Sequence, residues 1–204
     1  NFVSNPGCYP TGILLGIFPL LKEKVIKQEG VIVDSKSGVT GAGRTLKEEI
    51  LFSECAENMK AYGIGEHKHI PEIEEEMSKI YSDEIKISFT PHLVPVKRGI
   101  LSTIYCDLKD KFNVEDILDL YQRLYQNEEF IKILPLGKFP ETKNVVGSNY
   151  CHIGIKVDER TSKVIVISAI DNLIKGAAGQ AIQNMNIMCG LEENTGLKNP
   201  GFFP

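Results

Sequence analysis

The strongest constraint on the fold lies at residues 5–11, where the sequence NPGCYPT joins a tight turn to the start of a helix. Pro6 and Gly7 favour a sharp turn, and Pro10 suits a first helical turn because its missing N–H would have no partner there. Apolar residues then recur at helical spacing. This pattern predicts a helix over residues 9–27.

The same motif makes Cys8 the candidate nucleophile. It precedes the predicted helix, where unpaired backbone N–H groups and the positive end of the helix dipole favour a thiolate. Low thiol pKa values recur at such positions, although a free cysteine is also a common core residue. The other four cysteines have no such placement and are interpreted as structural: Cys55, Cys106, Cys151 and Cys189.

Composition limits the class of protein. The chain has 204 residues, of which 42% are hydrophobic and 25% charged, enough for one large domain or two small ones. A net charge of −4 argues against a general binder of nucleic acid or of anionic membranes. No apolar run approaches the roughly 20 residues that span a bilayer. Five cysteines without a CxxC pair fit a reducing compartment, so we expect a cytoplasmic protein.

The chain opens at Asn1, without an initiator methionine, and its best catalytic motif follows within ten residues. A nucleophile needs surrounding protein that excludes water. We therefore expect the chain to be a fragment that lacks a preceding domain.

A glycine-rich loop follows a short buried strand predicted at residues 31–35. The loop spans residues 36–44, contains three glycines and ends at Arg44. Its backbone N–H groups could bind an anion with Arg44 as the counter-charge, and a flexible turn is the alternative. Its spacing matches neither phosphate-binding fingerprint, and no GxGxxG occurs in the chain. A complete nucleotide-binding half is therefore not expected.

A second candidate site is the sequence HKHIPEI at residues 67–73. His67 and His69 are two residues apart, so in an extended segment they would project to one face. No third ligand at metal-site spacing is evident nearby, so we expect acid–base chemistry and no metal. Pro71 then opens a helix whose first turns are rich in glutamate, as the helix dipole favours.

The rest of the chain predicts an α+β fold with a mostly antiparallel or mixed sheet. Asn113 is a helix cap, and the small residues around Gly176 and Gly179 indicate close packing. The other predicted elements are short helix 46–52, strands 85–89, 93–107 and 130–135, helix 114–125, and a hairpin of strands 150–157 and 163–170.

Five motifs together resemble one enzyme family. They occur in the order seen in the N-acetyl-γ-glutamyl-phosphate reductases of arginine biosynthesis, at residues 6–12, 37–44, 67–73, 89–100 and 171–181. That family is similar in architecture to glyceraldehyde-3-phosphate dehydrogenase. The resemblance implies a catalytic and oligomerisation domain at residues 1–170, and a C-terminal helix and tail at 171–204 that would return to an absent NADP-binding domain.

The resemblance also implies a reaction. Cys8 would attack an acyl phosphate, release phosphate and form a thioester, which NADPH would reduce to N-acetylglutamate 5-semialdehyde. A histidine of the HxH pair would handle protons, with His67 preferred over His69. The implied substrate contacts are Ser37, Gly38, Arg44 and Arg98. The implied cofactor contacts are Asn172, Lys175 and Gly176.

The implied partners are a small acyl phosphate and further copies of the chain, as a homodimer or homotetramer. We expect the outer face of the sheet to make that contact. Ile104, Val157 and Val166 belong to its strand patterns, although the sequence does not say which way they face. Three alternatives stay open: a related aminoadipyl- or aspartyl-phosphate reductase, a Cys-His hydrolase or acyltransferase, and a non-enzymatic oligomerisation module.

Overall fold

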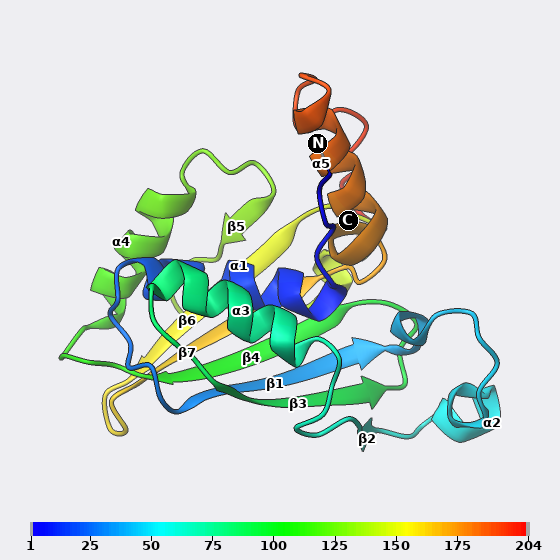
Figure 1. The fold of residues 1–204 in the computed structure, drawn as a ribbon, viewed down its shortest axis with the longest axis horizontal. Coiled ribbons are helices and arrows are strands. Elements are labelled where there is room, and N and C mark those ends of the chain that lie inside the picture. The colour runs from blue at the N-terminus through cyan, green and yellow to red at the C-terminus, as the bar shows by residue number, and fades with distance from the viewer. Residues whose placement is uncertain (1, 203–204) are drawn as a thin grey trace.

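A seven-stranded mixed sheet forms the body of the computed structural model, which describes residues 2–202 (Figure 1). Its strand order is β2-β3-β1-β4-β7-β6-β5. The pairs β1/β3 and β5/β6 are parallel and the others are antiparallel, so the predicted α+β class with a mixed sheet is confirmed. The strands are β1 Val31–Gly38, β2 Lys60–Ala61, β3 Ile87–Val94, β4 Ile100–Asp107, β5 Ile131–Ile133, β6 Cys151–Asp158 and β7 Lys163–Ile170.

Three longer helices cover one face of this sheet, and a fourth stands off beside the N-terminal segment (Figure 1). The α-helices are α1 Cys8–Lys22, α2 Phe52–Cys55, α3 Ile70–Tyr81, α4 Val114–Tyr125 and α5 Gly179–Met188. Short 3-10 turns are η1 Val39–Ala42, η2 Glu48–Ile50 and η3 Thr142–Asn144, and η4 Ile174–Ala178 is a π-helical turn. Asn1 and residues 203–204, at the ends of the predicted segments 1–170 and 171–204, lie outside the described residues.

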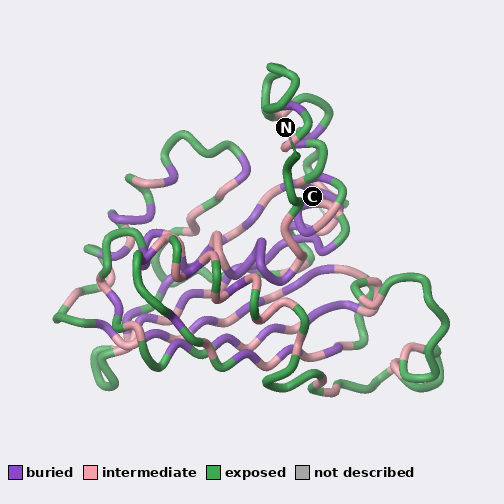
Figure 2. Tube along the Cα trace, in the orientation of Figure 1, coloured by how far each residue is buried: buried purple, intermediate pink, exposed green. Residues whose placement is uncertain are grey.

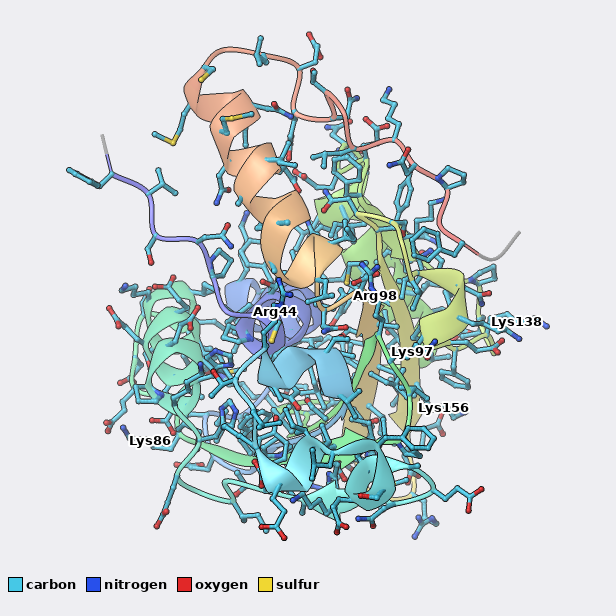
Figure 3. All side chains as sticks on the ribbon, turned by 90° about the vertical axis from the view of Figure 1, so that its right-hand side faces the viewer. Arg44, Lys86, Lys97, Arg98, Lys138 and Lys156 are labelled. Atoms are coloured by element: carbon cyan, nitrogen blue, oxygen red, sulfur yellow. The ribbon has the colours of Figure 1, made fainter. Side chains whose placement is uncertain are left out.

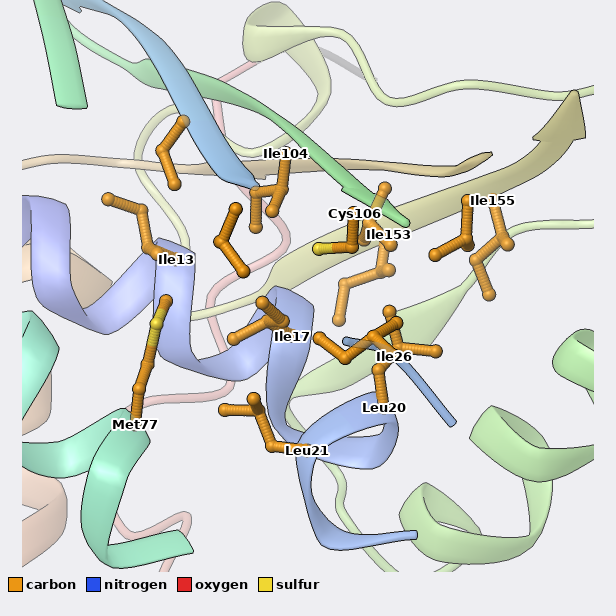
Figure 4. Packing of buried hydrophobic residues seen from close by; sticks show 14 of the residues in the cluster. Ile13, Ile17, Leu20, Leu21, Ile26, Met77, Ile104, Cys106, Ile153 and Ile155 are labelled. Atoms are coloured by element: carbon orange, nitrogen blue, oxygen red, sulfur yellow. The ribbon is translucent and has the colours of Figure 1, made fainter. Parts of the chain in front are cut away.

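Side-chain alternation along the strands explains this layering. Every second residue is buried against the helices, and the residues between them are partly or fully exposed on the opposite face (Figure 2). Ile13 and Ile17 of α1 pack with Ile104 of β4 in the continuous core (Figure 4). Helix α1 approaches the sheet closely at Gly16, where a Cβ atom would lie 3.0 Å from Ile104 Cδ1. The core thus fixes α1, and with it Cys8, against the sheet.

Local sequence signals correctly predicted the starts of two helices. Asn113 caps α4 through a reciprocal capping box with Asp116, as the sequence predicts for a helix start. Pro71 lies in the first turn of α3, whose buried residues Ile73 and Met77 pack against the core. The predicted hairpin of β6 and β7 is also confirmed.

Other boundaries differ from the sequence prediction. Helix α1 ends at Lys22 instead of residue 27, because Lys24 adopts a left-handed backbone with φ 53°. The helix predicted at 46–52 is replaced by η2 and the short α2, whose residues bury no side chain in the core. Strand β1 continues to Gly38 because it pairs with β3 and β4 along its length.

The sheet face opposite the helices is open among the described residues. Ile32 lies on it with 43% of its surface exposed, and partly exposed Tyr105 is its register partner on β4. Ile104, Val157 and Val166 are instead buried on the helix side, so none of these three faces outward. None of the described helices has the length and apolar character needed to cross a bilayer.

Candidate active site

A pocket of about 680 Å³ lies at the N-terminus of α1. Its walls come from the end of β1, the η1 turn, the segment from β2 to α3, and the η4 turn. The pocket brings together most of the residues that the sequence singled out. The predicted residues that line it are Cys8, Ser37, His67, His69, Asn172 and Gly176.

Cys8 is the first residue of α1, after Gly7 as the N-cap. Burial raises the pKa of the Cys8 thiol, while backbone N–H groups of Tyr9 and Cys8 and the charge of Lys68 act in the opposite direction. The helix start therefore has the predicted effect, but the predicted thiolate is wrong for this structure, because burial outweighs that effect. A base is needed to activate the thiol at neutral pH.

The two histidines meet, although not on an extended segment. Residues 63–66 turn before His67, and His69 is the helical N-cap of α3, yet the two rings lie 4.9 Å apart between centroids. The backbone N–H of His69 donates to His67 Nδ1 over 3.1 Å, which leaves the proton of neutral His67 on Nε2. The His69 ring lies against Gly7, and its Nδ1 has no hydrogen-bond partner among the described residues.

Burial lowers the pKa of both imidazoles. The pKa of His67 falls to about 4, with His69 and Lys68 adding to the effect, and the pKa of His69 is lowered by burial and by Lys68. Both rings are therefore neutral at pH 7, and a ring nitrogen that neither carries the proton nor accepts a hydrogen bond can take up a proton. The pair provides a base beside a protonated thiol.

We expect the stability of the chain to fall as the pH decreases from about 6.5 toward 4. In this window the unfolded chain protonates His67, whose ordinary pKa is about 6.5, while the folded chain does not. The free energy of unfolding therefore rises with pH there. His67→Asn should show a smaller loss of melting temperature between pH 7 and pH 5 than the unmodified chain. Equal pH slopes for the two proteins would contradict this expectation.

Two tyrosines belong to the site and were missed by sequence reasoning. The Tyr9 and Tyr62 hydroxyls lie 2.9 Å apart, and both residues line the pocket. Burial raises the pKa of both phenols, so both stay protonated as hydrogen-bond donors. Their rings pack edge-on against His67, at 5.4 and 5.6 Å between centroids. No sequence signal distinguishes Tyr62 from an ordinary loop tyrosine, since it lies 53 residues from its partner.

The η4 turn closes the pocket against Cys8. A Cβ atom on Gly176 would lie 2.9 Å from Cys8 Cβ, so only glycine fits there. A Cβ atom on Gly179 would lie 2.3 Å from Asn149 Oδ1. The close packing predicted for these two glycines is confirmed, and at Gly176 the neighbour is the candidate nucleophile itself.

Two of the predicted cofactor contacts form hydrogen bonds with other residues of the protein. Asn172 accepts a hydrogen bond from the Gly99 N–H over 2.7 Å and donates to Thr40 Oγ1 over 2.9 Å. Lys175 is buried, donates to Gln183 Oε1 over 2.7 Å and lines a different pocket, so its prediction as a contact in this site is not supported. Asn172 and Gly176 are the predicted cofactor residues that line the pocket of the candidate nucleophile.

Three predicted substrate contacts lie outside the pocket. Arg98 lies on the turn between β3 and β4 (Figure 3). It forms a 2.8 Å ion pair with the fully buried Asp171. Arg44 follows η1 and is exposed to solvent. Gly38 is buried under the β3–β4 turn, with its Cβ position 2.8 Å from the Arg98 backbone nitrogen. Of the predicted substrate residues, Ser37 lines the pocket, and residues 40–43 of the predicted anion-binding loop line it as well.

Metal chemistry receives no support from the ligand geometry. Within residues 2–202, no group of three or more His, Cys, Asp or Glu side chains is arranged to hold a metal ion. All five cysteines are free thiols. The pocket brings together a thiol, two neutral imidazoles, two phenols and the charged side chains of Lys47, Glu49, Lys60, Glu66 and Lys68.

Comparisons with known proteins agree with this geometry. The family described as "Semialdehyde dehydrogenase, dimerisation domain" matches residues 8–172. N-acetyl-gamma-glutamyl-phosphate reductase of Thermoanaerobacter sp. (strain X514) is 55% identical over 99% of this chain and 58% of its own length. The protein of that name from Alkaliphilus metalliredigens (strain QYMF) is 57% identical over 100% of this chain and 59% of its own length. The chain thus spans less than two thirds of these relatives, and the resemblance seen in its motifs is confirmed.

Solved structures support the same fold. Aspartate semialdehyde dehydrogenase II of Vibrio cholerae matches with a TM-score of 0.72 and 19% identity, over 92% of this chain and 62% of that chain. A probable aspartate-semialdehyde dehydrogenase from Pseudomonas aeruginosa gives a TM-score of 0.72 at 16% identity, over 92% and 62% of the two chains. Identity this low supports the fold alone. The chain belongs to the semialdehyde dehydrogenase family and contains its dimerisation domain.

Proposed function

We propose that the chain is the catalytic part of an N-acetyl-γ-glutamyl-phosphate reductase, an enzyme of arginine biosynthesis. One observation carries the proposal. Cys8, at a helix start, shares a pocket with a pair of neutral histidines in a chain that is 55% identical to a reductase of that name. The reaction would convert N-acetylglutamyl 5-phosphate to N-acetylglutamate 5-semialdehyde and phosphate in the cytoplasm.

The residues of the pocket account for the acyl-transfer half of this reaction. Cys8 is a partly buried, protonated thiol, so an imidazole takes its proton as the sulfur attacks the acyl carbon. The C–S bond forms, the bond to the phosphate oxygen breaks, and a thioester on Cys8 results. Backbone N–H groups at the start of α1 lie beside the reacting sulfur and can stabilise negative charge that develops there.

The contacts favour His69 over His67 as that base, which reverses the preference drawn from the sequence. His67 Nδ1 is engaged by a backbone N–H, and its Nε2 carries the proton. The His69 nitrogen that lies against Gly7, next to Cys8, is Nε2, and the buried Nδ1 has no hydrogen-bond partner among the described residues. We therefore assign proton transfer to His69 and orientation of the loop to His67.

NADP(H) fits the pocket only in part. Gly176 packs directly against Cys8 and lines the same pocket, so it is the residue of this chain proposed to meet the cofactor near the sulfur. When bound, NADPH would supply the hydride that reduces the thioester. The exposed apolar side chains of α5, such as Met185 and Met188, support the proposal that residues 171–204 return to a nucleotide-binding domain.

The open sheet face is the proposed contact between copies of the chain. This face carries the exposed Ile32. The family that matches the chain is described as a dimerisation domain. Ile32→Glu should convert the chain from dimer to monomer in sedimentation at about 10 μM, because a stable interface buries more than about 1,000 Å² and would place this charge inside it. Met188→Glu on α5, which stands apart from that face, is the control (Figure 1). A monomeric unmodified chain, or a dimeric Ile32→Glu variant, would refute the proposed interface.

A chimeric reductase tests the proposed function. In it, this chain replaces the matching residues of the Thermoanaerobacter enzyme, so that the remainder of that enzyme is present. We expect phosphate-dependent reduction of NADP with N-acetylglutamate 5-semialdehyde and no comparable rate with aspartate semialdehyde or aminoadipate semialdehyde. Turnover of esters or amides without a nicotinamide would instead indicate a Cys-His hydrolase. No turnover of any of these would leave the oligomerisation module as the better description.

A further inference from the structure

The start of helix α1, which carries Cys8, is held from outside that helix. Gly7, the residue before Cys8, donates its backbone N–H to Glu72 Oε1 over 2.9 Å, across 65 residues of sequence. Glu72 lies in the first turn of α3, the helix that runs beside α1 (Figure 1). The N-cap of the nucleophile's helix is therefore tied to the helix that begins directly after the HxH pair.

Gly7 is constrained on its other sides as well. Its carbonyl accepts hydrogen bonds from the Thr11 N–H over 3.0 Å and from Thr11 Oγ1 over 2.9 Å. Its Cα faces the His69 ring so closely that a Cβ atom would lie 2.5 Å from His69 Nε2. The backbone angles, φ −66° and ψ 160°, are accessible to any residue. Contact with His69, and not backbone strain, is thus the reason for glycine at position 7.

We propose that Glu72 is a positioning residue, which acts with His69 to fix Gly7 and thereby the place of the Cys8 thiol. The carboxylate suits this task because it sits at two helix starts at once: it belongs to the first turn of α3 and accepts from the N-cap of α1. Helix N-termini favour negative charge. The inference deepens the proposed function, since it concerns the orientation of the proposed nucleophile.

Charge gives Glu72 a second, separable effect on the thiol. Its carboxylate raises the pKa of Cys8, whereas Lys68 on the same segment lowers it. The phenols and imidazoles around the sulfur belong to Tyr9, Tyr62, His67 and His69 and are neutral at pH 7. The other charged side chains that line the pocket are those of Lys47, Glu49, Lys60 and Glu66. A variant that keeps the hydrogen bond but removes the charge should therefore change the titration of Cys8 without loosening the N-cap.

Two variants of the 204-residue chain separate these effects. Glu72→Gln keeps an acceptor oxygen for the Gly7 N–H, and Glu72→Ala removes it. In Glu72→Ala we expect the Gly7 amide to exchange with deuterium about ten-fold faster or more, since a hydrogen bond to a charged group contributes on that scale. In Glu72→Gln that amide should stay protected. Glu75→Gln, on the exposed side of α3, is the control and should match the unmodified chain in all measurements.

Alkylation of Cys8 gives the second measurement. The pH dependence of iodoacetamide labelling, followed by peptide mapping, should give a lower thiol pKa in Glu72→Gln with an unchanged limiting rate. Glu72→Ala should raise the limiting rate several-fold, because the thiol loses its fixed, partly buried position. Gly7→Ala should resemble Glu72→Ala, because its methyl group displaces His69.

Three results would overturn the proposal: a Gly7 amide equally protected in all variants, Cys8 titrations that do not distinguish Glu72→Gln from Glu75→Gln, or equal limiting rates in Glu72→Gln and Glu72→Ala. If Glu72→Ala fails to fold, the amide protection and lowered thiol pKa in Glu72→Gln still decide the question. None of these measurements involves substrate or cofactor. Their failure is therefore distinct from a failure of the proposed reductase activity, which the chimeric reductase tests.

Discussion

Replacing Cys8 by serine in the chimeric reductase is expected to lower turnover by about four orders of magnitude or more, since the covalent step is then lost. A hydroxyl is a weaker nucleophile than a thiol, and an ester is reduced less readily than a thioester. The change removes one sulfur atom from the start of α1 and leaves the contacts of Gly7 and Gly176 in place. Steady-state kinetics with N-acetylglutamate 5-semialdehyde, phosphate and NADP measures the loss.

Cys189→Ser is the matched control for this prediction. Cys189 is exposed just after α5 and does not line the pocket, so its replacement should leave turnover within about two-fold of the unmodified chimera. Circular dichroism should show the same helix content for both variants. Near-normal turnover of Cys8→Ser would refute the assignment of the nucleophile.

The second large effect is expected at Arg98. Its partner Asp171 is fully buried and also accepts hydrogen bonds from the N–H groups of Gly147, Leu173 and Ile174. Arg98→Ala should lower the free energy of unfolding by about 3–5 kcal/mol, the usual cost of leaving a buried carboxylate without its counter-ion. Urea denaturation of the 204-residue chain measures this loss.

A surface ion pair provides the comparison. Arg160 lies 3.3 Å from Asp158 and its side chain is 83% exposed, so Arg160→Ala should cost about 1 kcal/mol or less. Asp171→Asn tests the other partner and should also be destabilising. Arg98 and the Gly147 N–H both contact Asp171 Oδ2, and an NH2 group in place of that oxygen could accept neither. If Arg98→Ala costs no more than Arg160→Ala, the buried ion pair does not stabilise the fold.

Local sequence signals were sufficient for the elements that position the nucleophile. The helix that starts at Cys8 and Pro71 at the start of α3 both depend on residues within a few positions. The sharp turn predicted at Pro6 and Gly7 is wrong, because Gly7 is an extended N-cap with φ −66° and ψ 160°. Backbone preferences of proline and glycine act over that range, so they can be read from the chain directly. The alternation in β6 and β7 is equally local, and their pairing follows from a short turn.

The parts of the site that could not be predicted depend on distant partners. Arg98 has the charge expected of a substrate contact, but its direction is set by Asp171, 73 positions later. Lys175 likewise turns to Gln183 in the interior and not toward Cys8. Tertiary packing determines which partner a charged residue meets. The residue type and its motif are therefore compatible with a ligand contact and with an internal structural contact.

The protonation of Cys8 is a similar case. The helix start indicates a thiolate, and the backbone N–H groups do lower the pKa of the thiol. How much of the sulfur is buried depends on Gly176 and on the His69 side of the pocket, which come from other parts of the chain. Sequence position alone could identify the residue, but it could not determine the balance between these opposing effects.

The most direct test is to capture the acyl group on Cys8. The chimeric reductase is incubated with N-acetylglutamate 5-semialdehyde and NADP in the absence of phosphate, quenched in acid and analysed by peptide mass spectrometry. We predict one N-acetylglutamyl group on the peptide that contains Cys8, lost when phosphate is added before the quench. An acyl group on another residue, or NADPH formed in amounts equal to the enzyme without any acylated peptide, would contradict a thioester on Cys8.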